Sequence, residues 1–279
     1  MQGACKRILH SVVNKDGNTM SDTQKKVLEV RNLTHSFDTK KALDDVSFDV
    51  NDGEFLAILG PSGCGKTTIL RSLIGLLNVD SGSIMMDGKD ITHASPADRN
   101  MGIVFQNYAL FENMSVLKNV QYALKMNKKT RANSKEEALK MIESMGLSEH
   151  ANKKPGMLSG GQQQRVAIAR TLVLRPRVIL FDEPMSALDV ETRLSLRAEI
   201  KRIQKEYSTT MIYITHDQEE AFAMADRIMV MDEAKLIQLD TPMNIINNPA
   251  NEYVVRFVLN NLKIKIDSLA KYTNMGDKA

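Results

Sequence analysis

The stretch that decides the fold is G-P-S-G-C-G-K-T-T, at residues Gly60–Thr68. It follows the apolar run Phe55–Leu59 and precedes a helix predicted over Lys66–Leu77, so it joins a strand to a helix. Glycines allow backbone amides to converge on phosphate oxygens, and the helix directs its positive N-terminal end to the same point. In this setting the pattern G-x-x-x-x-G-K-[ST] predicts a phosphate-binding loop rather than a structural glycine turn.

Two side chains of this loop have specific expected roles. The Lys66 cation is expected to reach the β- and γ-phosphates of a nucleotide, and the Thr67 hydroxyl is expected to ligate Mg²⁺. The candidate ATP-binding residues of the loop are Gly60, Pro61, Ser62, Gly63, Cys64, Gly65, Lys66, Thr67 and Thr68.

Cys64 lies among the converging amides, close to Lys66 and to the N-terminus of the predicted helix. These surroundings favour the thiolate, so we expect a reactive thiol that bound ATP protects. A small buried filler residue is the alternative. Together Cys5 and Cys64 fit neither a disulfide framework nor a zinc site.

A second apolar run, Val178–Phe181, ends in two acids, Asp182 and Glu183. Open α/β sheets bind ligands at the carboxyl ends of their strands, so Asp182 is expected beside the phosphate loop as a magnesium ligand. Glu183 is expected to face the γ-phosphate, where a carboxylate orients and deprotonates the attacking water. By itself such a pair often marks a strand-end turn, but behind a phosphate loop it indicates hydrolysis.

Two further polar residues follow predicted strands. His216 comes directly after Met211–Thr215 and is a candidate for contact with the γ-phosphate, although a lone histidine is often structural. Gln106 ends the apolar strand Gly102–Phe105, and a solvated loop glutamine is its alternative interpretation. Their positions at strand ends make both candidates for the catalytic edge of the sheet.

The run L-S-G-G-Q-Q-Q-R, at Leu158–Arg165, begins another predicted helix, Gln162–Leu174. Ser159 and the amides of Gly160–Gly161 at its start would form a second anion site. A capped helix start is the simpler interpretation and leaves the glycines unexplained. Because a lone nucleotide-binding domain has no use for a second anion site, this run implies a second copy of the protein.

The alternation of strands and helices predicts an α/β fold with a parallel central sheet. Val27–Val50 and Asp80–Asp90 resemble antiparallel strand pairs, and Lys118–His150 has apolar residues at helical spacing. We therefore expect a P-loop NTPase core with a mostly parallel sheet, an antiparallel β subdomain and a helical subdomain at about 107–160. The expected division is a flexible N-terminal arm at 1–26, an ATPase domain at 27–260 and a short C-terminal tail at 261–279.

Composition excludes several classes of protein. The 279 residues are 43% hydrophobic, which is enough for a full core. No apolar run reaches the ~18 residues that span a bilayer, and no signal-peptide pattern is present, so we expect a cytosolic protein. The net charge of +3 is too balanced to indicate binding to nucleic acid.

From about Val27 to Val258, these motifs resemble the nucleotide-binding subunit of an ATP-binding cassette (ABC) transporter. The resemblance implies ATP and Mg²⁺ as cofactors, Glu183 as general base, and a head-to-tail homodimer around two ATP. In such a dimer the L-S-G-G-Q segment caps the γ-phosphate held by the partner. It further implies a magnesium- and membrane-sensing role for Gln106. The remaining residues that it implies are Phe37, which stacks on adenine, Ser159, Gly160, Gly161 and Gln162 in the cap, Ser186–Asp189 in a coupling loop, and His216 as the switch histidine.

Asn107–Val116 resembles the corresponding segment of bacterial importers that use an extracellular substrate-binding protein. This implies a peripheral location on the cytoplasmic face of the membrane, transmembrane permease subunits as partners, and a small polar substrate such as a phosphonate or polyamine. Such subunits often carry a regulatory β-domain, which we do not expect here. A soluble ABC-type ATPase switch or an exporter subunit is the alternative.

Overall fold

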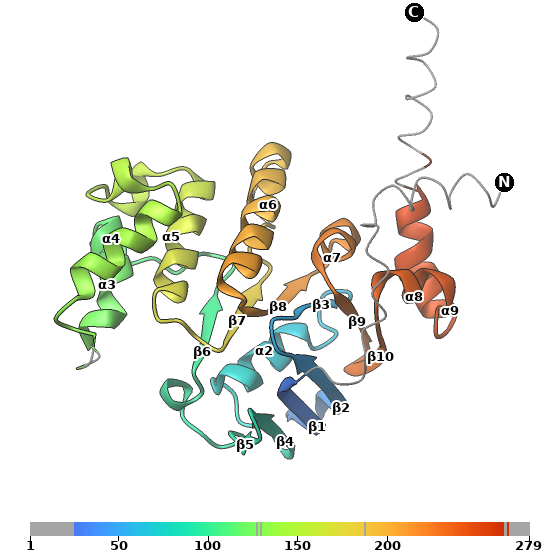
Figure 1. Ribbon diagram of the computed structural model, residues 1–279. Helices are drawn as coiled ribbons and strands as arrows, with labels where there is room; N and C mark the ends of the chain where they lie inside the picture. Colours follow the sequence, from blue (N-terminus) through green and yellow to red (C-terminus); the bar gives the residue numbers. More distant parts are fainter. Residues whose placement is uncertain (1–24, 127, 129, 187, 265–266, 268–279) are drawn as a thin grey trace, which may run out of the picture.

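A computed structural model describes residues 25–126, 128, 130–186, 188–264 and 267 (Figure 1). The expected N-terminal arm therefore lies outside the described residues, apart from its last two positions. Of the expected tail, 261–264 and 267 are described, and Ala187 of the expected coupling loop also lies outside.

The centre of the fold is a six-stranded sheet in the order β10-β9-β3-β8-β7-β6. Its strands run parallel from β9 through β6, and β10 closes the edge in the antiparallel direction. Every residue of β3 and β8 is buried, as expected for strands covered on both faces. The strands are β3 (Phe55–Leu59), β6 (Met101–Val104), β7 (Val178–Asp182), β8 (Thr210–Thr215), β9 (Arg227–Asp232) and β10 (Lys235–Asp240).

A smaller antiparallel sheet has the order β2-β1-β4-β5. Helix α2 (Lys66–Ile74) lies between the two sheets, and its apolar residues share one core with both. The helix ends three residues before its predicted end because Gly75 adopts a left-handed conformation, with φ of 82°. The strands are β1 (Lys26–Phe37), β2 (Lys40–Asn51), β4 (Ser81–Met86) and β5 (Lys89–Asp90).

The other face of the large sheet is covered by helices, among them α6 (Val190–Tyr207) and α7 (Gln218–Met224) (Figure 1). Three helices gather beside β6, namely α3 (Val116–Met126), α4 (Ser134–Ser144) and α5 (Gly160–Leu172). The predicted helical segment is thus interrupted between α3 and α4.

The β9 and β10 end of the sheet packs against the last described helices. These are α8 (Pro242–Asn247) and α9 (Glu252–Val254), and α9 runs into a wider helical turn at Val255–Asn260. Among the described residues, none of the helices has both the length and the apolar character that a membrane crossing requires.

Candidate functional site

Strand order brings the predicted site residues to one edge of the large sheet. Strands β3, β8, β7 and β6 are parallel neighbours, so their carboxyl ends lie side by side. The phosphate loop follows β3, His216 follows β8, Asp182 ends β7, and Gln106 lies two residues beyond β6. This edge is where open α/β sheets bind their ligands.

The phosphate loop is held closed by its own lysine. Lys66 is buried, and its Nζ donates hydrogen bonds to the carbonyl oxygens of Gly60 (2.8 Å) and Pro61 (2.9 Å). Gly65 has φ of 108°, and a Cβ there would lie 2.4 Å from the Ala42 carbonyl oxygen. Only glycine fits that position, and Gly65 gives α2 no side-chain cap, so the amides of the first turn are left for a ligand.

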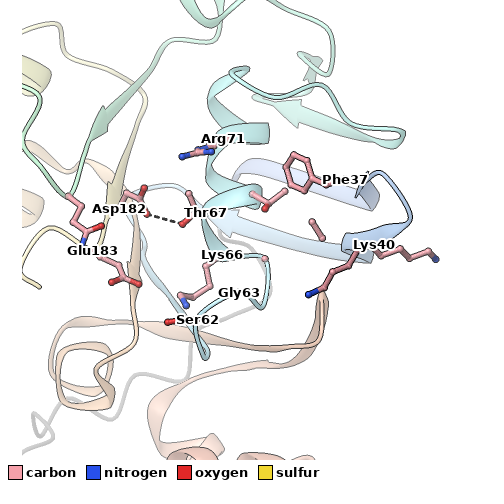
Figure 2. A pocket seen from close by; sticks show the side chains of 14 residues that line it. Phe37, Lys40, Ser62, Gly63, Lys66, Thr67, Arg71, Asp182 and Glu183 are labelled. Carbon is pink, nitrogen blue, oxygen red and sulfur yellow. Dashed lines mark hydrogen bonds between the residues drawn. The ribbon is translucent and has the colours of Figure 1, made fainter.

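A cavity of about 560 Å³ opens over this loop (Figure 2). Phe37, which is half exposed, stands at one end, and Asp182 and Glu183 stand at the other. Of the loop residues, Gly60, Pro61 and Cys64 do not line it. The lining residues are Phe37, Lys40, Lys41, Ala42, Ser62, Gly63, Gly65, Lys66, Thr67, Thr68, Arg71, Gln106, Asp182 and Glu183.

Thr67 and Asp182 meet across the cavity floor. The Thr67 hydroxyl donates a hydrogen bond of 3.3 Å to Asp182 Oδ1, which Figure 2 shows as a dashed line. Burial raises the pKa of the Asp182 carboxyl, and the hydrogen bond from Thr67 opposes that effect. Within the described part of the chain, no three His, Cys, Asp or Glu side chains cluster as a metal site. The hydroxyl and carboxylate fit Mg²⁺, which takes few protein ligands and completes its coordination with phosphates and water.

Glu183 pairs with His216. The distance between Glu183 Oε2 and His216 Nδ1 is 3.0 Å, and the two residues extend from neighbouring strands. Glu183 has φ of 45°, a left-handed conformation that is uncommon outside glycine and is found at functional sites. Gln106 Nε2 donates a 3.0 Å hydrogen bond to Ser186 Oγ, which donates to the Glu183 carbonyl oxygen.

The expectation of a thiolate at Cys64 is wrong. The residue is 4% exposed, and this burial raises the pKa of its thiol, while the Lys66 charge opposes the shift only in part. A Cβ on Gly60 would lie 2.6 Å from the Cys64 sulfur, so the side chain packs behind the loop. Burial could not be inferred from the pattern, because the same spacing suits a thiol facing either the ligand or the core.

The L-S-G-G-Q segment does not line this cavity. Its helix α5 begins at Gly160, two residues before the predicted start. The Ser159 side chain accepts a hydrogen bond from the Gln162 amide (3.3 Å), and Gln162 Oε1 accepts one from the Ser159 amide (2.9 Å). A Cβ on Gly161 would lie 2.7 Å from Thr192, so glycine permits close packing against α6. The capped-helix interpretation is thus part of the explanation.

Three basic residues of the cavity were not expected from the sequence. Lys40 and Lys41 reach it from the start of β2, and Arg71 reaches it from α2. Arg71 follows Thr67 by four positions, which places both on one face of the helix and could have been recognised. No sequence pattern identifies the two lysines, because charged residues beside a turn are normally exposed to water.

Known proteins of one class resemble this chain. The family described as ABC transporter matches residues 43–186. The spermidine/putrescine import ATP-binding protein PotA of Marinobacter nauticus is 48% identical over 83% of this chain and 62% of its own length. The protein of that name from Aggregatibacter actinomycetemcomitans is 46% identical over 84% of this chain and 63% of its own length. The chain thus spans less than two thirds of these curated relatives.

Among solved structures, cbiO1 from Clostridium perfringens, part of the ABC transporter complex cbiONQ, matches with a TM-score of 0.76. It is 28% identical, and the match covers 88% of this chain and 100% of that one. The predicted α/β P-loop NTPase fold is confirmed. Because the family match extends over more than half of the residues, this chain belongs to the ABC transporter family.

Proposed function

We propose that this chain binds ATP with Mg²⁺ and hydrolyses it to drive a membrane importer. The observation that carries the proposal is the contact between Glu183 and His216 at the edge of a cavity that also holds the phosphate-loop lysine. Phosphoryl transfer to water requires a carboxylate that orients the water, ligands for Mg²⁺ and a loop that binds the phosphates. Here Glu183 lies next to the Thr67–Asp182 pair and the phosphate loop.

Each side chain contributes a separate part of the reaction. Lys66 and the first-turn amides of α2 bind the β- and γ-phosphates, and Phe37 stacks on the adenine. Thr67, Asp182 and Gln106 would hold Mg²⁺, which neutralises phosphate charge when bound. The Glu183 carboxylate accepts the proton of the attacking water, and His216 holds that carboxylate and contacts the γ-phosphate.

Hydrolysis by the purified chain tests this assignment directly. Phosphate release is expected with MgATP and should cease when the metal is chelated. A well-folded protein that binds ATP but releases no phosphate, either alone or in its membrane complex, would contradict the proposal.

We further propose a head-to-tail dimer of residues 27–260, with the helical subdomain at about 107–160 presenting Ser159, Gly160, Gly161 and Gln162 to the partner's ATP. Two facts support the dimer. The segment lies outside this chain's own nucleotide cavity, and its helix N-terminus suits an anion. ATP should therefore be bound between two copies, each supplying one half-site.

The permease is proposed to dock in a groove beside α3 and α5. This groove of about 290 Å³ includes Phe111, Tyr122 and Arg170, with the two rings 4.8 Å apart and the guanidinium over Phe111. Phe111 and Tyr122 are both more than one third exposed, which favours an apolar partner. Cysteines at Phe111 and Tyr122 should crosslink to the permease, whereas crosslinks only from the exposed face of α6 would move the interface.

The proposed cargo is a polyamine, carried to the permease by an extracellular binding protein. The relatives named as spermidine/putrescine import proteins support this cargo over a phosphonate. Cells with the intact transporter should accumulate radiolabelled spermidine or putrescine, and cells lacking this chain should not. Uptake of a phosphonate instead of a polyamine would contradict the proposed cargo. Efflux of the substrate would indicate an exporter subunit, and ATP hydrolysis that serves no permease would indicate a soluble switch. The expected location is the cytoplasmic face of the membrane.

A further inference from the structure

Arg193 joins two segments that flank the Glu183–His216 pair. It lies in the first turn of α6, and its Nη2 donates a 3.2 Å hydrogen bond to the carbonyl oxygen of Leu188, in the segment that follows Glu183. Its Nη1 lies 3.4 Å from Asp217 Oδ2, in the residue after His216. One planar guanidinium therefore contacts both segments, a geometry that a lysine ammonium does not reproduce.

A buried carboxylate completes this arrangement. Glu220 of α7 is 4% exposed, and its Oε1 lies 4.0 Å from Arg193 Nε. Its Oε2 accepts hydrogen bonds from the hydroxyls of Tyr213 (2.9 Å) and Thr215 (2.8 Å). Burial and the Glu220 charge raise the pKa of Tyr213, so its hydroxyl stays a donor. A carboxylate this deeply buried is stabilised by cations nearby. Arg193 contacts Glu220 directly, and the charge of Arg197, one turn further along α6, acts on Tyr213 beside it.

The same contacts determine where His216 lies. Its side chain is 58% exposed, so packing does little to hold the ring in place. Its neighbours in the chain, Thr215 and Asp217, are held in place by hydrogen bonds instead. The Thr215 hydroxyl donates a hydrogen bond to Glu220 and accepts one of 3.0 Å from the Asp217 amide. The residues around a small cavity of about 40 Å³ include Glu183, His216 and Arg193, so the network lies directly against the catalytic pair.

We infer that Arg193 is a positioning residue, which holds the His216 segment against the Glu183 segment through Asp217 and Glu220. This role rests on the proposed function, since it acts on the carboxylate that activates water. Arg193 does not line the nucleotide cavity, so its loss should affect turnover rather than ATP binding. We expect Arg193→Ala to lower kcat by ~10-fold or more, with a change in KM below ~2-fold.

A double-mutant cycle tests the route through His216. Hydrolysis rates are measured with enzyme in excess over ATP, so that the rate of a single turnover can be determined even for slow variants. Arg193→Ala should slow hydrolysis strongly in the parent and by less than ~2-fold in a His216→Ala background. Equal factors in both backgrounds would overturn the inference. Asp217→Asn keeps the α7 cap but loses the charge that faces Arg193, so it should behave like Arg193→Ala and provides a second route if that variant folds poorly.

A measurement without hydrolysis separates this inference from the proposed function. Histidine ring signals are recorded by NMR on protein labelled with ¹³C-histidine, and His216 is assigned from His216→Ala. Arg193→Ala should shift or broaden that signal. The matched control is Arg202→Ala, because Arg202 is also on α6 but pairs with Glu199 and Glu206 of its own helix. An unmoved His216 signal in folded Arg193→Ala would overturn the positioning role, whereas absence of ATP hydrolysis in the parent would count against the proposed function alone.

Discussion

Two helix N-termini of this molecule lie in glycine-bearing motifs, and they differ in how their amides are used. At α2, Gly65 supplies no side-chain cap, and a cavity with Lys66 and Thr67 opens over the first turn. At α5, Ser159 and Gln162 cap one another, and the segment lies outside that cavity. The first is the proposed nucleotide site within one chain, whereas the second is a preformed surface whose proposed ligand is held by another copy.

The largest expected effect comes from a change at Glu183, beside the proposed nucleotide site at the α2 N-terminus, which we call the α2 half-site. Glu183→Gln removes the proposed base but keeps the shape of the side chain, so ATP binding should remain while turnover falls by ~10²-fold or more. Phosphate release and binding of a fluorescent ATP analogue measure the two quantities. Near-normal turnover would assign the base to another residue.

A second pair of variants compares the two half-sites directly. Lys66→Ala deletes the buried phosphate-facing cation and should weaken ATP binding by ~10-fold or more. In a Glu183→Gln background, Ser159→Arg should leave ATP binding by the monomer intact but abolish the ATP-driven dimer, because it adds bulk to the cap.

Light scattering with and without ATP measures the dimer. Ser159→Ala is the comparison variant, since it loses the hydroxyl without adding bulk and should weaken the dimer less than Ser159→Arg does. A dimer that forms equally without ATP, or that survives Ser159→Arg, would contradict the shared site.

A smaller effect concerns the stability of the α2 half-site. Burial raises the folded-state pKa of Asp182 above its unfolded value of 3.8, so the ionised carboxylate is disfavoured in the folded protein. The contribution of this group to the free energy of unfolding therefore falls as pH rises from 3.8 through the folded-state pKa. Without nucleotide at neutral pH, Asp182→Asn should raise the melting temperature by ~1–3 °C while hydrolysis is lost.

The control for that measurement is Asp44→Asn. A hydrogen bond from Lys41 lowers the pKa of Asp44, so ionisation of this partly exposed group favours the folded state above its unfolded pKa. Its replacement should leave the melting temperature unchanged or lower it. A rise in both variants would show that burial of Asp182 is not the cause.

The smallest expected effect concerns the back of the phosphate loop. Because burial raises the pKa of Cys64, N-ethylmaleimide at pH 7 should modify it at least ~10-fold more slowly than free cysteine. Mass spectrometry of a Cys5→Ser protein measures the rate, and Cys64→Ser should keep its activity. Rapid labelling that MgATP suppresses would restore the interpretation of Cys64 as a reactive thiol.

The sequence was most informative where chemistry depends on neighbours along the chain. The spacing of Gly60, Gly65 and Lys66 between a strand and a helix is a local pattern, and it predicted the phosphate-binding loop; the alternation of strands and helices predicted the α/β fold. It was less informative at Gly75, where a left-handed residue ends α2 early, and at Cys64, where two environments share one spacing. Helix α5 also begins two residues before its predicted start, because the Ser159–Gln162 cap includes both glycines in the helix.

By itself, the sequence determined the phosphate loop, the strand-end acids and the helix start at the L-S-G-G-Q run, because each depends on residues within one turn or one strand. Only the tertiary structure decided which distant side chains meet. The adjacency of β7 and β8 brings Glu183 to His216, and the start of β2 brings Lys40 to the cavity. The packing of α6 against α7 places Arg193 beside Glu220. Strand order and helix packing arise from contacts far apart in the chain, so no local pattern encodes them.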